Sequence, residues 1–227
     1  MNLTTLRGSI EFWDQFAPWY EKWLSRGTYH KAIIRAVSEM IEPGWRVLDI
    51  GAGTGVLSIP MASLGCTVTA IEPSKGMSEL FSAKLSSLHV GTVDIAAIRW
   101  EGFQMEEGGR YDLILACNSL RLIQGGITGG MKRAFSMGGA YVSLITEINQ
   151  DIFIDFKTVD SLQDTYNFLS IRKYRADSSF FFEGMHEVER LQELLNREIQ
   201  VGMEDGRLVQ RDSTDIAVVW WEKKSGL

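Results

Sequence analysis

The stretch VLDIGAGTG at residues 47–55 places three glycines directly behind an apolar run that favours a β-strand. A glycine in the interior of a strand or helix costs about 0.5–1 kcal/mol relative to alanine. Gly51, Gly53 and Gly55 therefore indicate a backbone that turns sharply and leaves room for another group. The stretch predicts a strand that ends near Ile50, followed by a tight turn against a ligand.

Strand-like and helical runs alternate around this turn. The strand-like runs are residues 45–50, 67–71, 94–100, 111–117 and 140–146, and helical patterns lie between them up to residue 64, at about 74–86 and near 127–137. Such an alternation implies right-handed crossovers and a mostly parallel sheet with both faces covered. The expected fold class is α/β, a doubly wound Rossmann-like sheet with helices on both faces.

The two ends of the chain follow other patterns. Aromatic residues at helical spacing occupy residues 9–24, and Pro18 is expected to break this segment into two short helices. A further helix is expected within residues 28–42. Past residue 147, helices at about 154–169 and 185–196 flank β-rich pieces, and the C-terminus predicts an antiparallel hairpin that turns at Asp205 and Gly206.

Composition narrows the classes of partner. The formal net charge is −6, so no overall basic field attracts nucleic acid or anionic lipid. Only two cysteines are present, without a C-x-x-C pair, which argues against a disulfide framework or a metal site and fits a reducing cytosol. Residues 50–71 carry no charge over 22 positions, but their glycines and Pro60 favour a buried α/β unit over a membrane span. We expect a cytoplasmic protein.

Two ligand classes use a glycine turn after the first strand of such a sheet. A dinucleotide fingerprint reads G-x-G-x-x-G, and its third glycine would fall at position 56, which is Val56. The actual spacing is G-x-G-x-G. Asp49 lies two residues before Gly51, where a carboxylate repels a pyrophosphate but can organise the loop or an ammonium group.

The ordered set of motifs resembles that of class I methyltransferases, which use S-adenosylmethionine. VLDIGAGTG is similar to their cofactor loop, and Glu72 follows Gly51 by 21 residues, where that superfamily has an acid for the ribose hydroxyls. Glu101 follows the third strand, and YDLILACNSL at residues 111–120 is similar to the fourth strand and the active-site loop. The resemblance covers residues 12–146 well and the remainder only in outline.

The resemblance implies a role for each matching residue. Gly51, Ala52 and Gly53 approach the methionine part and ribose, Glu72 holds the ribose hydroxyls from a solvated strand tip, and Glu101 accepts from the adenine amino group. Asn118 and Ser119 lie under the sulfonium. The expected cofactor-binding residues are Tyr20, His30, Asp49, Gly51, Ala52, Gly53, Gly55, Glu72, Pro73, Met77, Glu101, Gly102, Phe103, Asn118 and Ser119.

The N-terminal segment carries a W-D-x-x-A-x-x-Y pattern that resembles a helix over the cofactor in this superfamily. It comprises Trp13, Asp14, Ala17 and Tyr20. The ring of Tyr20 faces the cationic sulfonium, or its hydroxyl bonds the cofactor carboxylate. His30 stands where some relatives have a basic residue for that carboxylate, although a packing role is an alternative.

The acceptor side is less defined, and no catalytic residue is assigned. Methyl transfer needs a general base only if the nucleophile arrives protonated. Leu120, Arg121 and Leu122 stand where superfamily relatives usually have a histidine-rich turn. Candidates to line an acceptor pocket are Glu147, Tyr166, Tyr174, Phe180, Phe181 and Phe182, with His186 as a weaker base candidate.

These observations predict a methyltransferase that acts on a small-molecule acceptor, without nucleic acid or membrane as a partner. A homodimer stays open. The alternatives are an NAD(P)-dependent oxidoreductase and a non-catalytic subunit that binds S-adenosylmethionine. Residues 1–227 are expected to form one domain, with a helical lid at 1–44, a cofactor-binding core at 45–146, and a substrate-side insert with a C-terminal hairpin at 147–227.

Overall fold

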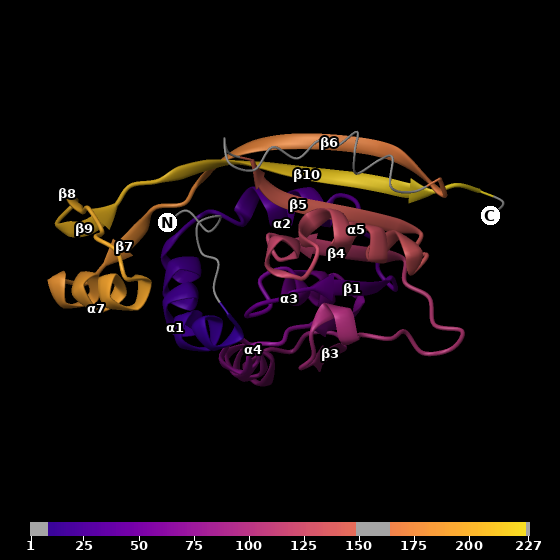
Figure 1. Cartoon of the computed structure of the whole chain (residues 1–227), viewed down its shortest axis with the longest axis horizontal. Coiled ribbons are helices and arrows are strands. Elements are labelled where there is room, and N and C mark those ends of the chain that lie inside the picture. Colours follow the sequence, from indigo (N-terminus) through magenta and orange to yellow (C-terminus); the bar gives the residue numbers. More distant parts are fainter. Residues whose placement is uncertain (1–8, 149–163, 226–227) are drawn as a thin grey trace.

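A seven-stranded sheet forms the centre of the computed structural model, which describes residues 9–148 and 164–225 (Figure 1). The strand order is β3-β2-β1-β4-β5-β10-β6. The strands are β1 (Arg46–Ile50), β2 (Thr67–Ile71), β3 (Val93–Ala96), β4 (Leu113–Cys117), β5 (Tyr141–Ile148), β6 (Tyr166–Asp177) and β10 (Ser213–Lys223). Strands β1 to β5 pair in parallel, and β10 runs antiparallel to both β5 and β6. The predicted fold class is confirmed.

Helices cover both faces of the sheet (Figure 1). They are α1 (Ile10–Arg26), α2 (Lys31–Ser38), α3 (Ser58–Ser63), α4 (Lys75–Ser87) and α5 (Gly126–Ser136), with single 3₁₀ turns at η2 (Trp100–Gly102) and η3 (Leu120–Leu122). Successive residues of a strand point to opposite faces. In β10, Ile216, Val218 and Trp220 therefore join the core beneath α1, α2 and α3, whereas Val219 and Trp221 join the core beneath α5.

Helix α1 is continuous through Pro18, so the predicted break is wrong. Proline removes one hydrogen bond and crowds the preceding turn. Here Phe16, Ala17 and Trp23 are buried on both sides of Pro18, which is itself exposed. Packing along the whole helix outweighs the local preference.

The segment after β5 also differs from expectation. Most of the helix predicted at 154–169 lies outside the described residues, but positions 166–169 begin strand β6, which pairs with β10 along its length. Asp205 and Gly206 do form the predicted turn, with φ of 47° and 75°. The hairpin joins β8 (Gly202–Glu204) to β9 (Arg207–Gln210), however, and β10 is a separate strand that completes the main sheet.

Residues between β6 and β10 form a small unit beside α1 (Figure 1). It consists of a three-stranded sheet in the order β7-β9-β8, with β7 at Phe180–Phe182, and helix α7 at Met185–Leu195. Phe180 and Phe182 are buried in the core that α1 covers. Among the described residues, every helix is too short or too polar to span a bilayer.

Candidate functional site

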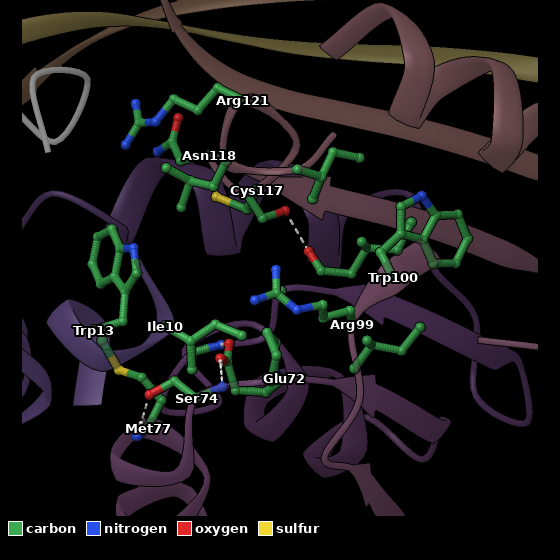
Figure 2. A pocket seen from close by; sticks show the side chains of 18 of the residues that line it. Ile10, Trp13, Glu72, Ser74, Met77, Arg99, Trp100, Cys117, Asn118 and Arg121 are labelled. Atoms are coloured by element: carbon green, nitrogen blue, oxygen red, sulfur yellow. Dashed lines mark hydrogen bonds between the residues drawn. The ribbon is translucent and has the colours of Figure 1, made fainter. Parts of the chain in front are cut away.

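A cavity of about 220 Å³, here called the main cavity, opens beyond the carboxyl ends of β1, β2 and β4 (Figure 2). The strand order reverses between β1 and β4, and such switch points are where doubly wound sheets bind ligands. Helix α1 closes the opposite side. The lining residues are Ser9, Ile10, Trp13, Tyr20, Ile50, Gly51, Gly53, Ile71, Glu72, Pro73, Ser74, Met77, Arg99, Trp100, Glu101, Cys117, Asn118, Ser119, Arg121, Leu122 and Ile123.

The three glycines of the turn have different structural reasons. All have positive φ, at 71°, 58° and 82° for Gly51, Gly53 and Gly55. A Cβ atom on Gly51 would lie 2.3 Å from the Cβ of Ser119, and one on Gly55 would lie 2.2 Å from the ring of Phe81. Among the described residues, the only neighbour within 4 Å of a Cβ atom on Gly53 is the Tyr20 ring, 3.6 Å away. Gly51 and Gly55 thus allow Ser119 and Phe81 to pack against the turn, whereas Gly53 leaves space at the cavity.

Glu72 ties the glycine turn to the start of α4. Its carboxylate accepts the N–H of Gly53 and the N–H of Ser74, each at 2.8 Å. Glu72 is only 7% exposed, so the prediction that this acid is solvated is wrong. Burial raises the pKa of Glu72 to about 7 against the two hydrogen bonds, which lower it. A carboxylate has about four lone-pair sites, so it retains acceptor capacity toward the cavity.

Asp49 and His30 line a smaller neighbouring space of about 30 Å³, here called the side cavity, together with Tyr20, Gly51, Ala52, Val56, Leu57, Cys117 and Asn118. The Ser58 hydroxyl donates to Asp49 at 2.6 Å, and burial raises the pKa of this carboxyl to about 6. Burial lowers the pKa of His30 to about 3. His30 is therefore neutral near pH 7, and the charge expected of a basic residue at this position is absent.

The opposite end of the main cavity contains Arg99, Trp100 and Glu101. Glu101 accepts the N–H of Gln124 at 2.9 Å and is exposed. Trp100 stacks on Phe103 with ring centroids 6.2 Å apart. Phe103 and Gly102 do not line the cavity, so Phe103 supports Trp100 from behind. Pro73 and Met77 line it as expected.

Asn118 and Ser119 are held rigidly at the end of β4. Asn118 has a positive φ of 54°; its amide donates to the Tyr29 hydroxyl at 2.9 Å and accepts the N–H of Glu147 at 2.9 Å. Tyr29 donates to Glu147 at 2.6 Å, and Arg121 lies 3.8 Å from the same carboxylate. Ser119 donates to the carbonyl oxygen of Ile50. This network fixes the loop beside the glycine turn.

The residues expected to line an acceptor pocket are not part of the main cavity. Glu147 is fully buried, and Tyr166 packs under α5 and donates to the carbonyl of Gly139 at 2.6 Å. Tyr174 lies on β6, the three phenylalanines form β7, and His186 is exposed on α7. None of these side chains lines the main cavity.

Sequence reasoning assigned no site role to several residues that line the main cavity, among them Arg99, Trp100, Cys117 and Arg121. The predicted third strand was extended to residue 100, but β3 ends at Ala96, and the chain then turns so that Trp100 reaches the cavity. Trp13 belongs to the W-D-x-x-A-x-x-Y pattern, which by itself gives the residue no role at the site. That pattern was the signal that could have identified it.

Comparisons with known proteins agree with this geometry. Residues 47–138 match the profile of a family described as "Methyltransferase domain". A ubiquinone biosynthesis O-methyltransferase of Xanthomonas axonopodis pv. citri (strain 306) is 34% identical over 116 residues, 47% of this chain and 48% of the relative. A protein of the same name from Burkholderia thailandensis is 43% identical over 79 residues, 34% of this chain and 33% of the relative. The chain thus spans about a third to a half of these curated relatives.

Solved structures share the fold at low sequence identity. Magnesium protoporphyrin IX methyltransferase from Synechocystis PCC 6803, solved with bound SAM, superposes with a TM-score of 0.54 at 13% identity, covering 83% of this chain and 76% of that one. TehB from Haemophilus influenzae gives a TM-score of 0.57 at 16% identity, covering 85% and 62%. The resemblance inferred from the motifs is confirmed in sequence profile and in fold.

Proposed function

We propose that this protein is an S-adenosylmethionine-dependent methyltransferase that acts on a small-molecule acceptor, because it resembles class I methyltransferases in sequence and fold. The observation that carries the proposal is the joint position of the glycine turn, Glu72 and Asn118 around one cavity at the switch point of the sheet. The matched family and the fold support the same activity.

The residues around the two cavities suit this cofactor chemically. The main cavity combines apolar walls at Ile50, Ile71 and Trp100 with the buried carboxylate of Glu72, which suits a nucleoside. The side cavity holds the carboxylate of Asp49 and the imidazole of His30, whose Nδ1 is buried without a hydrogen-bond partner among the described residues. These two groups match an ammonium and a carboxylate.

The protein's own contribution is to bind and align. When bound, S-adenosylmethionine supplies an electrophilic methyl group on a sulfonium, and the enzyme has to orient it toward the acceptor and exclude water. Glu72 would hold the ribose hydroxyls, Gly53 would admit the cofactor to the turn, and Tyr20 would cover it from α1. Asn118 and Ser119 would form a rigid floor, since both side chains are hydrogen-bonded to the protein.

The compartment, the domain organisation and the partners of the protein are also proposals. We propose that the chain acts in the cytoplasm, as one domain whose helix α1 serves as a lid, on neither nucleic acid nor membrane, because its net charge is −6. The relatives named as O-methyltransferases make hydroxyl-bearing small molecules the first acceptors to test.

A turnover assay tests the proposal. The full chain is incubated with S-adenosylmethionine and a panel of small phenols and hydroxy acids, and release of S-adenosylhomocysteine is measured. Acceptor-dependent release is the expected result. Tight binding of S-adenosylhomocysteine without release for any acceptor favours the non-catalytic alternative. Binding of NADP in place of the sulfur nucleosides favours the oxidoreductase alternative.

A further inference from the structure

The indole nitrogen of Trp13 is buried in the wall of the main cavity without a hydrogen-bond partner among the described residues. Buried polar groups in folded proteins nearly always have a partner, and buried tryptophan N–H groups usually find one. Figure 2 shows the indole standing at the edge of the cavity with its nitrogen on the inner side. A ligand in the cavity is therefore the partner that this donor lacks.

The ring of Trp13 is held in this orientation by its neighbours. Phe12 and Phe16 pack edge-on against it, with ring centroids at 5.5 Å and 5.6 Å. Both neighbours belong to the same helix, and Phe16 is fully buried. The indole is thus fixed relative to α1, and its position in the cavity depends on where α1 lies.

Asp14, the next residue, fixes α1 against the start of α4. Its Oδ1 atom accepts the hydroxyl of Ser74 at 2.6 Å and the N–H of Gly76 at 3.0 Å. The hydrogen bond from Ser74, followed by that from Gly76, lowers the pKa of Asp14 below its ordinary value, so it is ionised at neutral pH. An anionic group at a helix N-terminus is stabilised by the helix dipole.

Ser74 connects this contact to the acid of the cavity. Its N–H donates to Glu72 while its hydroxyl donates to Asp14. Gly76 allows the close approach, because a Cβ atom there would lie 2.5 Å from the carbonyl oxygen of Asp14. Farther along α1, Glu21 pairs with Lys84 of α4 at 2.9 Å. Through Ser74, Asp14 therefore fixes the position of α1 relative to Glu72.

We propose that Trp13 donates a hydrogen bond from its indole N–H to the cofactor bound in the main cavity, and that Asp14 is the positioning residue that aims it. The proposal rests on the function proposed above, since it takes S-adenosylmethionine as the ligand. It makes α1 a binding element with a donor of its own, in addition to a cover over the site.

The first test removes the donor and keeps an aromatic ring at the position. Trp13→Phe removes the N–H, and Trp19→Phe is the matched control, because Trp19 lies on the same helix, packs on Phe180 and does not line the cavity. S-adenosylhomocysteine is titrated calorimetrically into each full-length variant. Trp13→Phe should bind about tenfold more weakly than the unchanged chain, the scale of one buried hydrogen bond. Trp19→Phe should bind as the unchanged chain does.

A spectroscopic readout reports the hydrogen bond directly. In ¹⁵N-labelled protein, the Trp13 indole cross-peak is assigned by its loss in Trp13→Phe. On addition of S-adenosylhomocysteine this proton should move downfield, whereas the Trp19 indole proton should stay in place. An upfield shift or an unchanged position of the Trp13 proton would contradict the hydrogen bond.

Asp14 is tested with a pair of variants. Asp14→Asn keeps an oxygen that accepts from Ser74 and Gly76, and it should retain most of the affinity. Asp14→Ala removes both contacts and should weaken binding about as much as Trp13→Phe, and the double variant should be little weaker than either alone. Gly202→Ala is the control for a remote substitution, since a Cβ atom there has no neighbour within 4 Å in the part of the chain that the structure describes.

The outcomes distinguish a failure of the proposed function from a failure of the roles assigned to Trp13 and Asp14. If the unchanged chain fails to bind S-adenosylhomocysteine, the proposed function is wrong. If it binds, and Trp13→Phe matches Trp19→Phe in affinity, the assignment of Trp13 is overturned while the function stands. Additive losses for Trp13 and Asp14 overturn the positioning role of Asp14.

Discussion

At the scale of single residues, the site depends on a carboxylate that does two things. The carboxylate of Glu72 accepts the N–H of Gly53 in the glycine turn and the N–H of Ser74, the N-cap residue of α4, and Glu72 also lines the main cavity. A strand-tip acid was expected to be solvated, but this one is buried. Its loss should therefore affect both folding and binding.

Glu72→Ala should weaken binding of S-adenosylhomocysteine by about ten- to a hundredfold, because hydrogen bonds to charged groups contribute about 1.5–3 kcal/mol. The variant should also lower the free energy of unfolding of the ligand-free protein, since the N–H groups of Gly53 and Ser74 lose their acceptor. Calorimetry and urea unfolding on the same variant measure the two effects. Destabilisation with unchanged affinity would contradict the ribose role.

Glu72 should also make binding depend on pH. Burial raises its pKa to about 7, so the ionised form, the better acceptor, gains population as pH rises through 7. Affinity for S-adenosylhomocysteine should rise between pH 6 and pH 8, about one unit on either side of this pKa. In Glu72→Gln the rise should be smaller and limited to the part that Asp49 contributes, since the pKa of that carboxyl is about 6. A rise of the same size in that variant would assign the titration to another group.

Gly53 and Gly55 should respond differently to substitution although both have positive φ. Gly53→Val should abolish cofactor binding, because its side chain enters the space at the cavity beside Tyr20, and should keep the fold by circular dichroism. Gly55→Ala should mainly destabilise the fold, since its Cβ atom would meet the buried ring of Phe81 at 2.2 Å. Normal binding by a folded Gly53→Val variant would show that the loop is misassigned.

At the scale of elements, α1 is held from both sides. Asp14 and Glu21 attach it to α4, and Lys22 and Arg26 attach it to Glu187 on α7. Burial alone would raise the pKa of Glu187, but hydrogen bonds from Lys22, from the Glu183 N–H and from Arg26 outweigh it and lower the pKa to about 2. The unit between β6 and β10 thus supports the wall of the cavity.

Glu187→Gln should lower the free energy of unfolding at pH 7 by about 1.5–3 kcal/mol, the scale of hydrogen bonds to a charged group, because the partners Lys22 and Arg26 are themselves partly exposed. The folded pKa is depressed from an ordinary 4.5, so this stabilisation is present above pH 4.5 and is lost as pH falls toward 2. Urea unfolding at pH 7 and at pH 3 measures the difference. An equal gap between the variant and the unchanged chain at both values would contradict the assignment.

Sequence patterns predicted the elements whose signals are local. The first five strands alternate with helices at clear periodicity, and the glycine turn with Glu72 and Asn118 was sufficient to locate the cavity. Strand β6 was missed because it depends on pairing with β10, far away in the sequence. The continuity of α1 through Pro18 depends on tertiary burial, and the burial of Glu72 depends on how α4 begins. Local sequence propensity predicts none of these three features, because each depends on tertiary contacts.

At the scale of the whole molecule, the main cavity joins segments from Ser9 to Ile123, which the sheet order brings to one edge. Strands β5, β6 and β10 extend the sheet away from this edge and contribute no side chain to the cavity lining. The described fold thus separates a compact ligand site from a larger supporting sheet. The ligand class is the central claim, because every residue role above follows from it.

Calorimetric titration of the full chain with S-adenosylhomocysteine, with NADP as the matched control, tests that claim most directly. We expect saturable binding of S-adenosylhomocysteine and no heat of binding with NADP. At 100 times the dissociation constant the ligand should add about 2.7 kcal/mol to the free energy of unfolding. Binding of NADP together with no binding of S-adenosylhomocysteine would contradict the account.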